Sequence, residues 1–249
     1  MRKKIKKIIE FISTFICSFI TYLIALPLAA IIFFVGYLAK VLKLDGILTF
    51  LIRIWCQLFF SIIGIKLKAH GLEKVDKNKQ YLIVANHASY YDIPAIMHFI
   101  PNLVWVANKR FFNVLIFGSF LRLMETIPVD PNNFKESKSA IEKISYRVGK
   151  TKTRSICIFP EGTRTMDGKI HNFKRGFLTI LKYTNFDLLP VTLNGTYHVK
   201  PKWSFFIHWV PSVDVIFHDP IPHSNINFDD EKGTAAYIQD IIEKDYQLK

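Results

Sequence analysis

The chain has 249 residues, enough for one domain with a sizeable hydrophobic core. Half of the residues are hydrophobic and 14% are aromatic, which is rich for a soluble enzyme, and the formal net charge is +13. This charge indicates an anionic partner: nucleic acid, an anionic membrane surface or a phosphorylated substrate. Three scattered cysteines, Cys17, Cys56 and Cys157, form no zinc spacing and no disulfide framework, so we expect buried, reduced thiols.

The chain opens with a basic stretch followed by a long apolar segment. Five positive charges lie between Met1 and Lys7, and residues 11–39 then contain no charged residue. These 29 positions would span about 43 Å as a straight helix, against a hydrocarbon core of about 30 Å. The segment is too long for the apolar part of a signal peptide. Pro27 should kink or break the helix, so a tilted crossing and a re-entrant hairpin both fit the pattern.

A second apolar segment runs over residues 47–65, and Arg53 is its only charged residue. Its polar residues recur every four positions and therefore form one narrow stripe on a helix: Thr49, Arg53, Gln57 and Ser61. One interpretation is a helix packed on the folded domain, with the stripe making internal hydrogen bonds. The other is a helix that lies in the membrane interface or pairs with the first apolar segment.

From residue 65 onward, apolar strand patterns alternate with helical patterns. We predict strands over residues 65–69, 81–85, 103–107, 126–129, 155–159, 188–193, 204–209 and 213–217, and helices over residues 92–100, 112–121, 135–147, 173–183 and 233–246. This alternation predicts an α/β fold with a central, largely parallel sheet flanked by helices. We expect two parts: an N-terminal apolar two-helix membrane motif over residues 1–64 and the α/β domain over residues 65–249.

The first stretch with a chemical signature follows the predicted strand over residues 81–85. It reads Asn-His-Ala-Ser-Tyr-Tyr-Asp over residues 86–92. His87 then lies at a strand end, and Asp92 lies five residues on, across a tight turn and near the first turn of a helix. This spacing can bring the carboxylate to one imidazole nitrogen and leave the other free as a general base. Alone, the pattern fits a polar turn with an Asp cap equally well.

A second stretch changes that balance. Phe-Pro-Glu-Gly-Thr-Arg over residues 159–164 follows another apolar run. The two stretches, about seventy residues apart and in this order, resemble the first block, Asn-His-x-Ser-x-x-Asp, and the third block, Phe-Pro-Glu-Gly-Thr-Arg, of the glycerolipid acyltransferase family. Within that family the resemblance is closest to the bacterial 1-acyl-glycerol-3-phosphate acyltransferases. It covers roughly residues 66–220.

The resemblance implies an acyltransferase that moves a fatty acyl group from an acyl thioester onto the free hydroxyl of lysophosphatidic acid, making phosphatidic acid for phospholipid synthesis. His87 would deprotonate the acceptor hydroxyl, with Asp92 orienting the imidazole. Arg164 would bind the phosphate of the acceptor, with Gly162 and Thr163 beside it. Glu161 would bind a glycerol hydroxyl or hold Arg164 in place. The expected co-substrate is acyl-carrier protein or coenzyme A thioester, with no further cofactor and no metal.

Further basic residues resemble other parts of the family pattern. Lys109 and Arg110 follow the predicted strand over residues 103–107, and Lys174 lies in the basic stretch after the third block. All three are expected to bind substrate. Where the family places an Arg after a Val-Asp pair, this chain has Pro131. A cation for the phosphate is then either absent or supplied by one of these three residues.

The basic N-terminus favours a cytoplasmic start. Because the donors used by this family are cytoplasmic thioesters, a single crossing would place the active site on the wrong side. We therefore predict a two-helix hairpin inserted from the cytoplasmic side into one leaflet of the cell (inner) membrane, with the catalytic domain in the cytoplasm. The expected partners are the lipid bilayer, lysophosphatidic acid and the thioester donor. We expect no nucleic-acid partner, because the densest basic cluster adjoins a lipid segment and no nucleic-acid motif is present.

Two alternatives stay open at this point. One is acylation of another lysolipid, for which Pro131 leaves room. The other is a non-catalytic membrane lipid-binding protein on the same fold, against which the four residues His87, Asp92, Glu161 and Arg164 stand.

Overall fold

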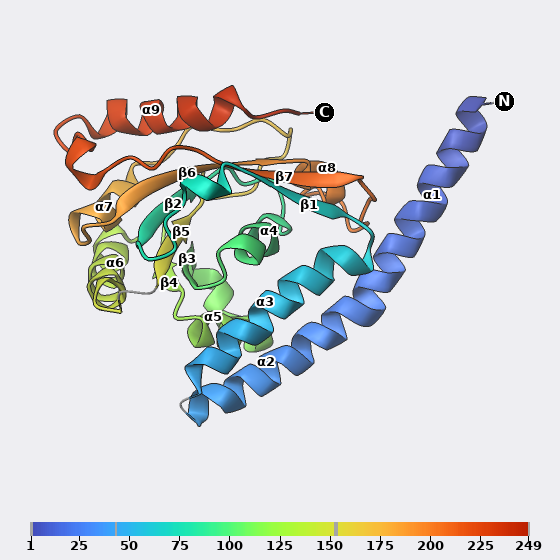
Figure 1. The fold of residues 1–249 in the computed structure, drawn as a ribbon, viewed down its shortest axis with the longest axis horizontal. Helices are drawn as coiled ribbons and strands as arrows, with labels where there is room; N and C mark the ends of the chain where they lie inside the picture. Colours follow the sequence, from blue (N-terminus) through green and yellow to red (C-terminus); the bar gives the residue numbers. More distant parts are fainter. Residues whose placement is uncertain (1, 43, 152–153, 249) are drawn as a thin grey trace.

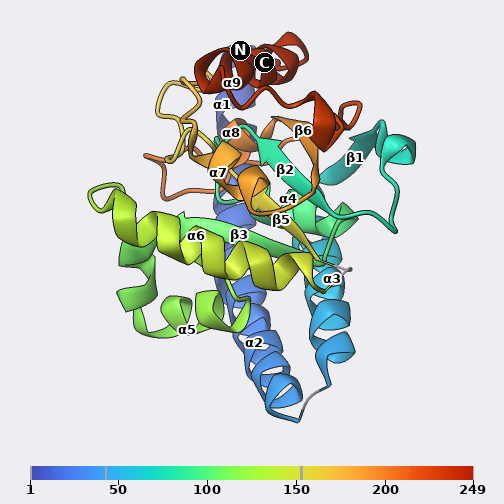
Figure 2. The same ribbon diagram turned by 90° about the vertical axis from the view of Figure 1, so that its left-hand side faces the viewer.

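The computed structural model describes residues 2–42, 44–151 and 154–248, without the side chains of residues 2–7, 26, 45, 48–49, 116 and 134. It has a seven-stranded, largely parallel sheet with helices on both faces, preceded by apolar helices (Figures 1 and 2). The predicted fold class is confirmed. The basic side chains over residues 2–7, which entered the topology prediction, lie outside the described residues.

The N-terminal segment forms one long helical rod. Helix α1 (Arg2–Ile20) continues through a π-helical turn η1 (Thr21–Ala25) into α2 (Leu26–Val41). Pro27 does not end the rod, because the wider π turn lies where its ring would otherwise clash with the carbonyl four residues earlier. The stretch Ile8–Val41 is long and apolar enough to cross a membrane. Figure 1 shows α3 (Asp45–Ile62) running back beside α2.

Helix α3 packs on the α/β domain through one apolar face. The rings of Phe59 and Phe60 lie 4.9 Å and 5.8 Å from that of Tyr91. The polar stripe faces outward instead: the side chains of Arg53 and Gln57 are exposed. Packing on the domain is therefore confirmed. Arg53, Gln57 and Ser61 face outward, and Ser61 Oγ bonds within its own helix, to the carbonyl of Gln57, rather than to the domain.

The sheet has the order β1-β7-β6-β2-β5-β3-β4. All neighbouring strands are parallel except β6 and β7, which are antiparallel. The strands are β1 (Lys66–His70), β2 (Tyr81–Ala85), β3 (Leu103–Asn108), β4 (Ile127–Val129), β5 (Ser155–Ile158), β6 (Asp187–Asn194) and β7 (Ser212–Phe217). Strand β2 lies centrally and is buried along its whole length, as expected for a parallel strand covered on both faces.

Alternate residues of β2 enter two separate hydrophobic clusters. Ile83 packs with residues of α3 and of α4 (Asp92–Phe99), and Leu82 packs with α6 (Phe134–Gly149), α7 (Gly176–Lys182) and α9 (Glu231–Lys244). The remaining helical segments are short: η2 (Leu72–Lys74), η3 (Lys109–Asn113), α5 (Leu115–Leu123), α8 (Thr196–Val199) and η4 (His223–Asn225). Figure 1 places α9 on the opposite side of the sheet from α2 and α3.

The predicted strand over residues 204–209 is wrong. These residues form an irregular segment, which we call the aromatic loop (residues 203–209). Its backbone bonds to side chains of the N-terminal rod rather than to a strand: the N–H of Ile207 donates to Ser18 Oγ at 2.9 Å, and Tyr22 donates to the carbonyl of Phe205 at 2.6 Å. The apolar run therefore belongs to a surface shared with α1, which a strand pattern does not reveal.

Candidate active site

His87 and Asp92 form the pair that their spacing predicts. His87 follows β2, and Asp92 is the first residue of α4. The tight turn between them directs the carboxylate of Asp92 toward the imidazole ring of His87. His87 Nδ1 lies 2.8 Å from Asp92 Oδ2. The same oxygen accepts the backbone N–H groups of Ala88 and Ser89, at 2.7 Å and 2.8 Å. Three donors on one buried oxygen fix the carboxylate, and the His87 ring directs Nε2 away from it.

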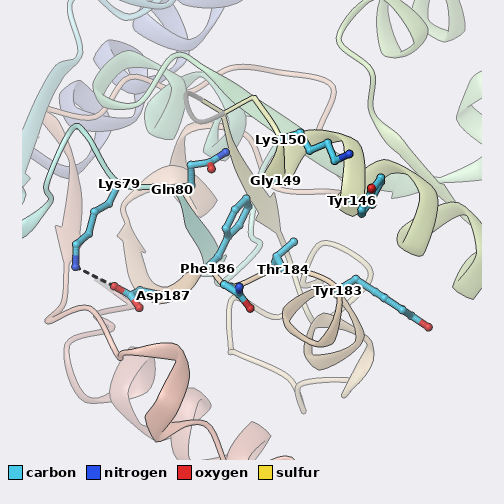
Figure 3. Close-up of a pocket in the computed structure, with 10 residues that line it drawn as sticks. Lys79, Gln80, Tyr146, Gly149, Lys150, Tyr183, Thr184, Phe186 and Asp187 are labelled. Atoms are coloured by element: carbon cyan, nitrogen blue, oxygen red, sulfur yellow. Dashed lines mark hydrogen bonds and ion pairs between the residues drawn. The ribbon is translucent and has the colours of Figure 1, made fainter.

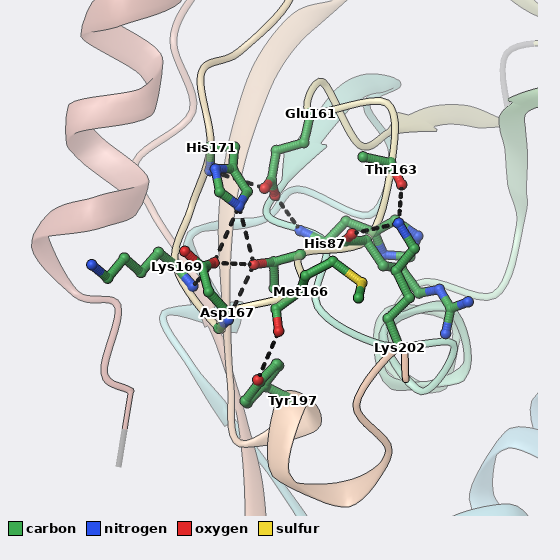
Figure 4. Close-up of polar contacts among 12 residues, drawn as sticks. His87, Glu161, Thr163, Met166, Asp167, Lys169, His171, Tyr197 and Lys202 are labelled. Atoms are coloured by element: carbon green, nitrogen blue, oxygen red, sulfur yellow. Dashed lines mark hydrogen bonds and ion pairs between the residues drawn. The ribbon is translucent and has the colours of Figure 1, made fainter. Parts of the chain in front are cut away.

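Residues of the third block and the residue after it hydrogen-bond to the backbone of His87. Glu161 Oε1 accepts the N–H of His87 at 2.7 Å, and the other oxygen accepts the N–H of His171 at 3.0 Å. Thr165 donates its N–H to the carbonyl of His87 at 2.9 Å. Figure 4 shows Glu161 reaching across between His171 and His87. The block thus holds the base in position through its main chain.

Glu161 is 4% exposed, and burial raises its pKa to about 7, although the two backbone N–H donors oppose that shift. Because both of its oxygens accept backbone N–H groups, Glu161 braces His87 rather than Arg164. The partners of Glu161 are therefore the backbones of His87 and His171, and not the side chain of Arg164. Its binding of a glycerol hydroxyl stays a prediction.

The ring of Phe159 lies under the imidazole of His87. The two ring centres are 3.9 Å apart and the planes differ by 5°, which is a stacked pair. Trp105 of β3 lies behind Phe159, with ring centres 5.5 Å apart. This aromatic support limits rotation of the imidazole ring, and it was not predicted from the sequence.

Asn86 ties the site to the next strand. Its side-chain amide donates to the carbonyl of Leu193 at 3.0 Å and accepts the N–H of the same residue at 2.8 Å. The side chain thereby continues the pairing of β2 with β6 by one step beyond the strand end. Ser89 makes a similar link by donating to the carbonyl of Lys200 at 2.9 Å.

Cations gather on the other side of the block. The guanidinium of Arg164 lies 3.6 Å from the ring centre of Tyr90, and its Nη1 is buried with no hydrogen-bond partner among the described residues. Lys202 Nζ donates to Thr163 Oγ1 at 2.8 Å and to the carbonyl of Arg164 at 3.3 Å (Figure 4). Burial, with Arg164 as a second cause, lowers the pKa of Lys200. The arrangement suits an anion.

Gly162 allows Lys174 to approach this group. Its φ is +73°, and a Cβ placed there would lie 2.9 Å from Lys174 Nζ. The predicted residues Gly162, Thr163, Arg164 and Lys174 therefore lie together. Lys200 and Lys202 were missed. Their Lys-Pro-Lys spacing directly before the aromatic loop is the sequence signal that could have found them.

Lys109 and Arg110 lie at the same edge of the sheet but farther along it. They follow β3, which is separated from β2 by β5, a distance of about 10 Å between strand axes. Lys109 pairs with Glu136 of α6, and Arg110 lies over the ring of Phe111 at 4.9 Å. Both cations are thus engaged by neighbours of their own rather than by the third block.

A pocket of about 540 Å³ lies at the opposite edge of the sheet (Figure 3). Gln80, just before β2, and Asp187, the first residue of β6, both line it. Parallel strands carry His87 and the third block at their carboxyl ends, so this pocket is separated from the pair by the length of the strands. It is not part of the candidate active site.

Comparisons with known proteins show a family and a shared fold. The family model described as "Acyltransferase" matches residues 66–194. A 1-acyl-sn-glycerol-3-phosphate acyltransferase from Cocos nucifera is 30% identical over 198 residues, covering 77% of this chain and 63% of that protein. One from Streptococcus pneumoniae is 29% identical and covers 80% and 71%. The chain spans less than two thirds of the length of the coconut protein and of a relative from Limnanthes douglasii, 63% in each case.

A solved structure shares the fold. The crystal structure of the 1-acyl-sn-glycerophosphate (LPA) acyltransferase from Thermotoga maritima aligns with a TM-score of 0.75 at 24% identity, covering 96% of this chain and 95% of that one. The similarity extends over the N-terminal helices as well as the sheet, because nearly the whole of both chains is aligned.

Proposed function

The chain belongs to the acyltransferase family, and from this premise we propose that it transfers a fatty acyl group from an acyl thioester to the free hydroxyl of 1-acyl-glycerol-3-phosphate, yielding phosphatidic acid. The observation that carries the proposal is the pair of His87 and Asp92, 2.8 Å apart, braced by the third block. The relatives from coconut and Streptococcus pneumoniae carry the name of this activity.

The reaction needs one base and no protein nucleophile. Asp92 holds the proton on Nδ1 of His87, so Nε2 carries the lone pair that removes the proton of the acceptor hydroxyl. The hydroxyl oxygen then attacks the thioester carbonyl, and the tetrahedral intermediate collapses with loss of the thiolate. The imidazolium returns its proton to that thiolate. The buried carboxylate of Asp92 stabilises the imidazolium while it exists.

The phosphate of the acceptor would bind at Arg164 and Lys202. In the part of the chain that the structure describes, Arg164 Nη1 has no hydrogen-bond partner, and a guanidinium offers the forked geometry that suits phosphate oxygens. Lys202 lies against the same loop through Thr163. Lys202 could replace the arginine that the family has at the position of Pro131. Lys109 is a weaker candidate for this role, because it already pairs with Glu136. Lys174, beside Gly162, completes the positive field.

We propose that the enzyme acts at the cytoplasmic face of a membrane, with acyl-carrier protein or coenzyme A thioester as donor. Lys40, near the tip of the hairpin, donates to the carbonyl of Leu123 at 2.9 Å and lies 3.6 Å from Glu125 of the α/β domain. A hairpin whose tip touches this domain favours insertion from one side over two full crossings. The apolar rod Ile8–Val41 supplies the surface for that insertion.

The test is acyl transfer by the purified full-length chain in liposomes. Oleoyl thioesters of coenzyme A and of acyl-carrier protein would each be offered with lysophosphatidic acid and, separately, with a lysophospholipid whose phosphate carries a headgroup. We expect phosphatidic acid as the main product. Product formed only with the second acceptor would support acyl transfer but refute lysophosphatidic acid as the acceptor. No product from any acceptor, with the protein folded, would refute the enzyme assignment.

A further inference from the structure

Helix α1 is amphipathic in the inverse sense to a helix of a water-soluble protein. Polar side chains four residues apart face the rest of the molecule: Thr14 lies 3.1 Å from His208 Nδ1, and Ser18 accepts the N–H of Ile207 at 2.9 Å. Its apolar side chains point outward and are exposed: Ile8, Ile9, Phe11, Ile12, Phe15, Ile16 and Phe19. Soluble helices do the opposite. The medium outside α1 must therefore be apolar.

The aromatic loop repeats this inverse pattern. Ser204 and Ile207 are directed inward and are 7% and 1% exposed, whereas the aromatic side chains are directed outward: Trp203, Phe205, Phe206 and Trp209. The loop is held in place by its own hydrogen bonds, because Ser204 Oγ accepts the N–H of Phe206 at 3.0 Å and His208 donates its N–H to the carbonyl of Val199 at 2.8 Å. The outward aromatic side chains therefore belong to an ordered surface.

The loop and the rod form one continuous surface. Tyr22, at the junction of α1 and α2, stacks on Phe205 with ring centres 4.9 Å apart and donates its hydroxyl to the carbonyl of that residue. The two segments are separated by more than 180 residues in the sequence, so an apolar face shared between them is a feature of the fold. Single exposed apolar side chains are common on soluble proteins, but a continuous apolar surface of this kind marks an interaction site.

The charge distribution identifies the occupant. Residues 188–213 contain no Asp or Glu, and Lys200 and Lys202 directly precede the exposed aromatic side chains. Tryptophan and basic residues beside an apolar surface are typical of the boundary between lipid headgroups and acyl chains. We propose that the aromatic loop is a second membrane-penetrating element, which enters the same leaflet as the outward face of α1.

The position of the loop relates it to the candidate site. Lys202 contacts Thr163 of the third block, and Trp203 is the next residue. Burial of the loop in the leaflet would hold Lys202 and Arg164 at the level of the headgroups, where the phosphate of a membrane-resident acceptor lies. Contact of the aromatic loop with lipid does not depend on the proposed reaction, and it can hold for a protein that transfers no acyl group.

The test measures the depth of a spin label in vesicles of phosphatidylethanolamine and phosphatidylglycerol. Phe206→Cys and Trp209→Cys place the label at two positions in the loop, and Tyr237→Cys places it on α9 across the sheet. Phe206 and Tyr237 are 54% and 58% exposed, so these two sites are matched in accessibility to water. The native thiols, Cys17, Cys56 and Cys157, are buried, and the unsubstituted protein gives the labelling background.

We expect the label in the loop to collide with a water-soluble nickel complex about tenfold less often than the label at residue 237, because polar reagents partition poorly into hydrocarbon. Oxygen collisions should rank in the reverse order. Equal nickel collisions at all three positions would overturn the proposal. Spectral broadening at 206 and 209 that grows with the protein-to-lipid ratio would also overturn it, by placing a second copy of the chain on this surface. Neither readout requires turnover.

Discussion

Asp92→Asn isolates the charge of the buried carboxylate while changing its shape little. In the native site one oxygen accepts N–H groups from His87, Ala88 and Ser89 at 2.7–2.8 Å, and the side chain is 0% exposed. An Asn oxygen can still accept these donors, so the turn and the tautomer of His87 should persist. The imidazolium formed during the reaction would lose its counter-charge.

The magnitude follows from Coulomb's law. Two unit charges about 4 Å apart interact by about 4 kcal/mol at an effective dielectric constant of about 20. This energy corresponds to about a thousandfold in rate. His87 is 14% exposed in its side chain, and solvent screening reduces the effect. We therefore expect kcat to fall by about 10²–10³-fold, with a small change in the KM of the acceptor.

The assay is steady-state acyl transfer, with thermal unfolding as a check that the variant folds. The chain offers a matched control in a second pair: His70 Nε2 lies 2.9 Å from Asp214 Oδ1 on the adjacent strands β1 and β7. Asp214→Asn removes the same kind of charge outside the candidate site and should leave kcat unchanged. A folded Asp92→Asn protein whose kcat lies within about threefold of wild type would refute the role assigned to the carboxylate, since that corresponds to less than about 1 kcal/mol.

Two further changes test the surroundings of the pair. Lys202→Ala should raise the KM for lysophosphatidic acid about tenfold with little change in kcat, because a charge-assisted contact to phosphate contributes about 1.5–3 kcal/mol. The control is Lys143→Ala, which removes an exposed lysine on α6. Equal KM values for the two variants would exclude a contact between Lys202 and the phosphate. Glu161→Gln tests the brace by pH. Burial raises the pKa of Glu161 to about 7, so the folded state holds its proton more tightly than the unfolded state, and the stability of wild type relative to the variant should fall as pH rises from about 4.5 to about 7. Urea unfolding at both pH values measures this, and a relative stability that rises with pH would show that the buried carboxyl is not destabilised by ionisation.

Much of the candidate site could be predicted from the sequence, because the residues that form it lie close together along the chain. A His five residues before an Asp, across a strand-to-helix turn, restricts the possible geometries enough to predict the pair. The grouping of Gly162, Thr163, Arg164 and Lys174 follows similarly from one block and the basic stretch after it. The roles assigned to these residues in substrate binding stay predictions.

The long-range contacts could not be predicted in the same way. Whether Glu161 would face Arg164 or the backbone of His87 depends on how the loops after β2 and β5 meet, which no local spacing encodes. The contact of Lys202 with Thr163 joins segments 39 residues apart. The aromatic loop was assigned to a strand because alternating apolar residues resemble one, whereas its true partner is a helix near the start of the chain. The division into parts at residues 64 and 65 likewise stays a prediction.

The family resemblance indicated by the two blocks is confirmed by the match over residues 66–194. The fold is confirmed over nearly the whole chain by the Thermotoga maritima structure. The choice of acyl donor, which the liposome assay tests, the inner-membrane location and the cytoplasmic orientation are proposals.

The proposed reaction depends above all on His87 acting as the base that activates a lipid hydroxyl. The most direct measurement compares wild type with His87→Ala in liposomes supplied with oleoyl thioester and lysophosphatidic acid, with thermal unfolding recorded for both proteins. We expect phosphatidic acid from wild type and a rate lower by about 10²–10⁴-fold in the variant, the loss expected for a general base. A folded His87→Ala protein that makes phosphatidic acid at nearly the wild-type rate would contradict the role of His87 as the base.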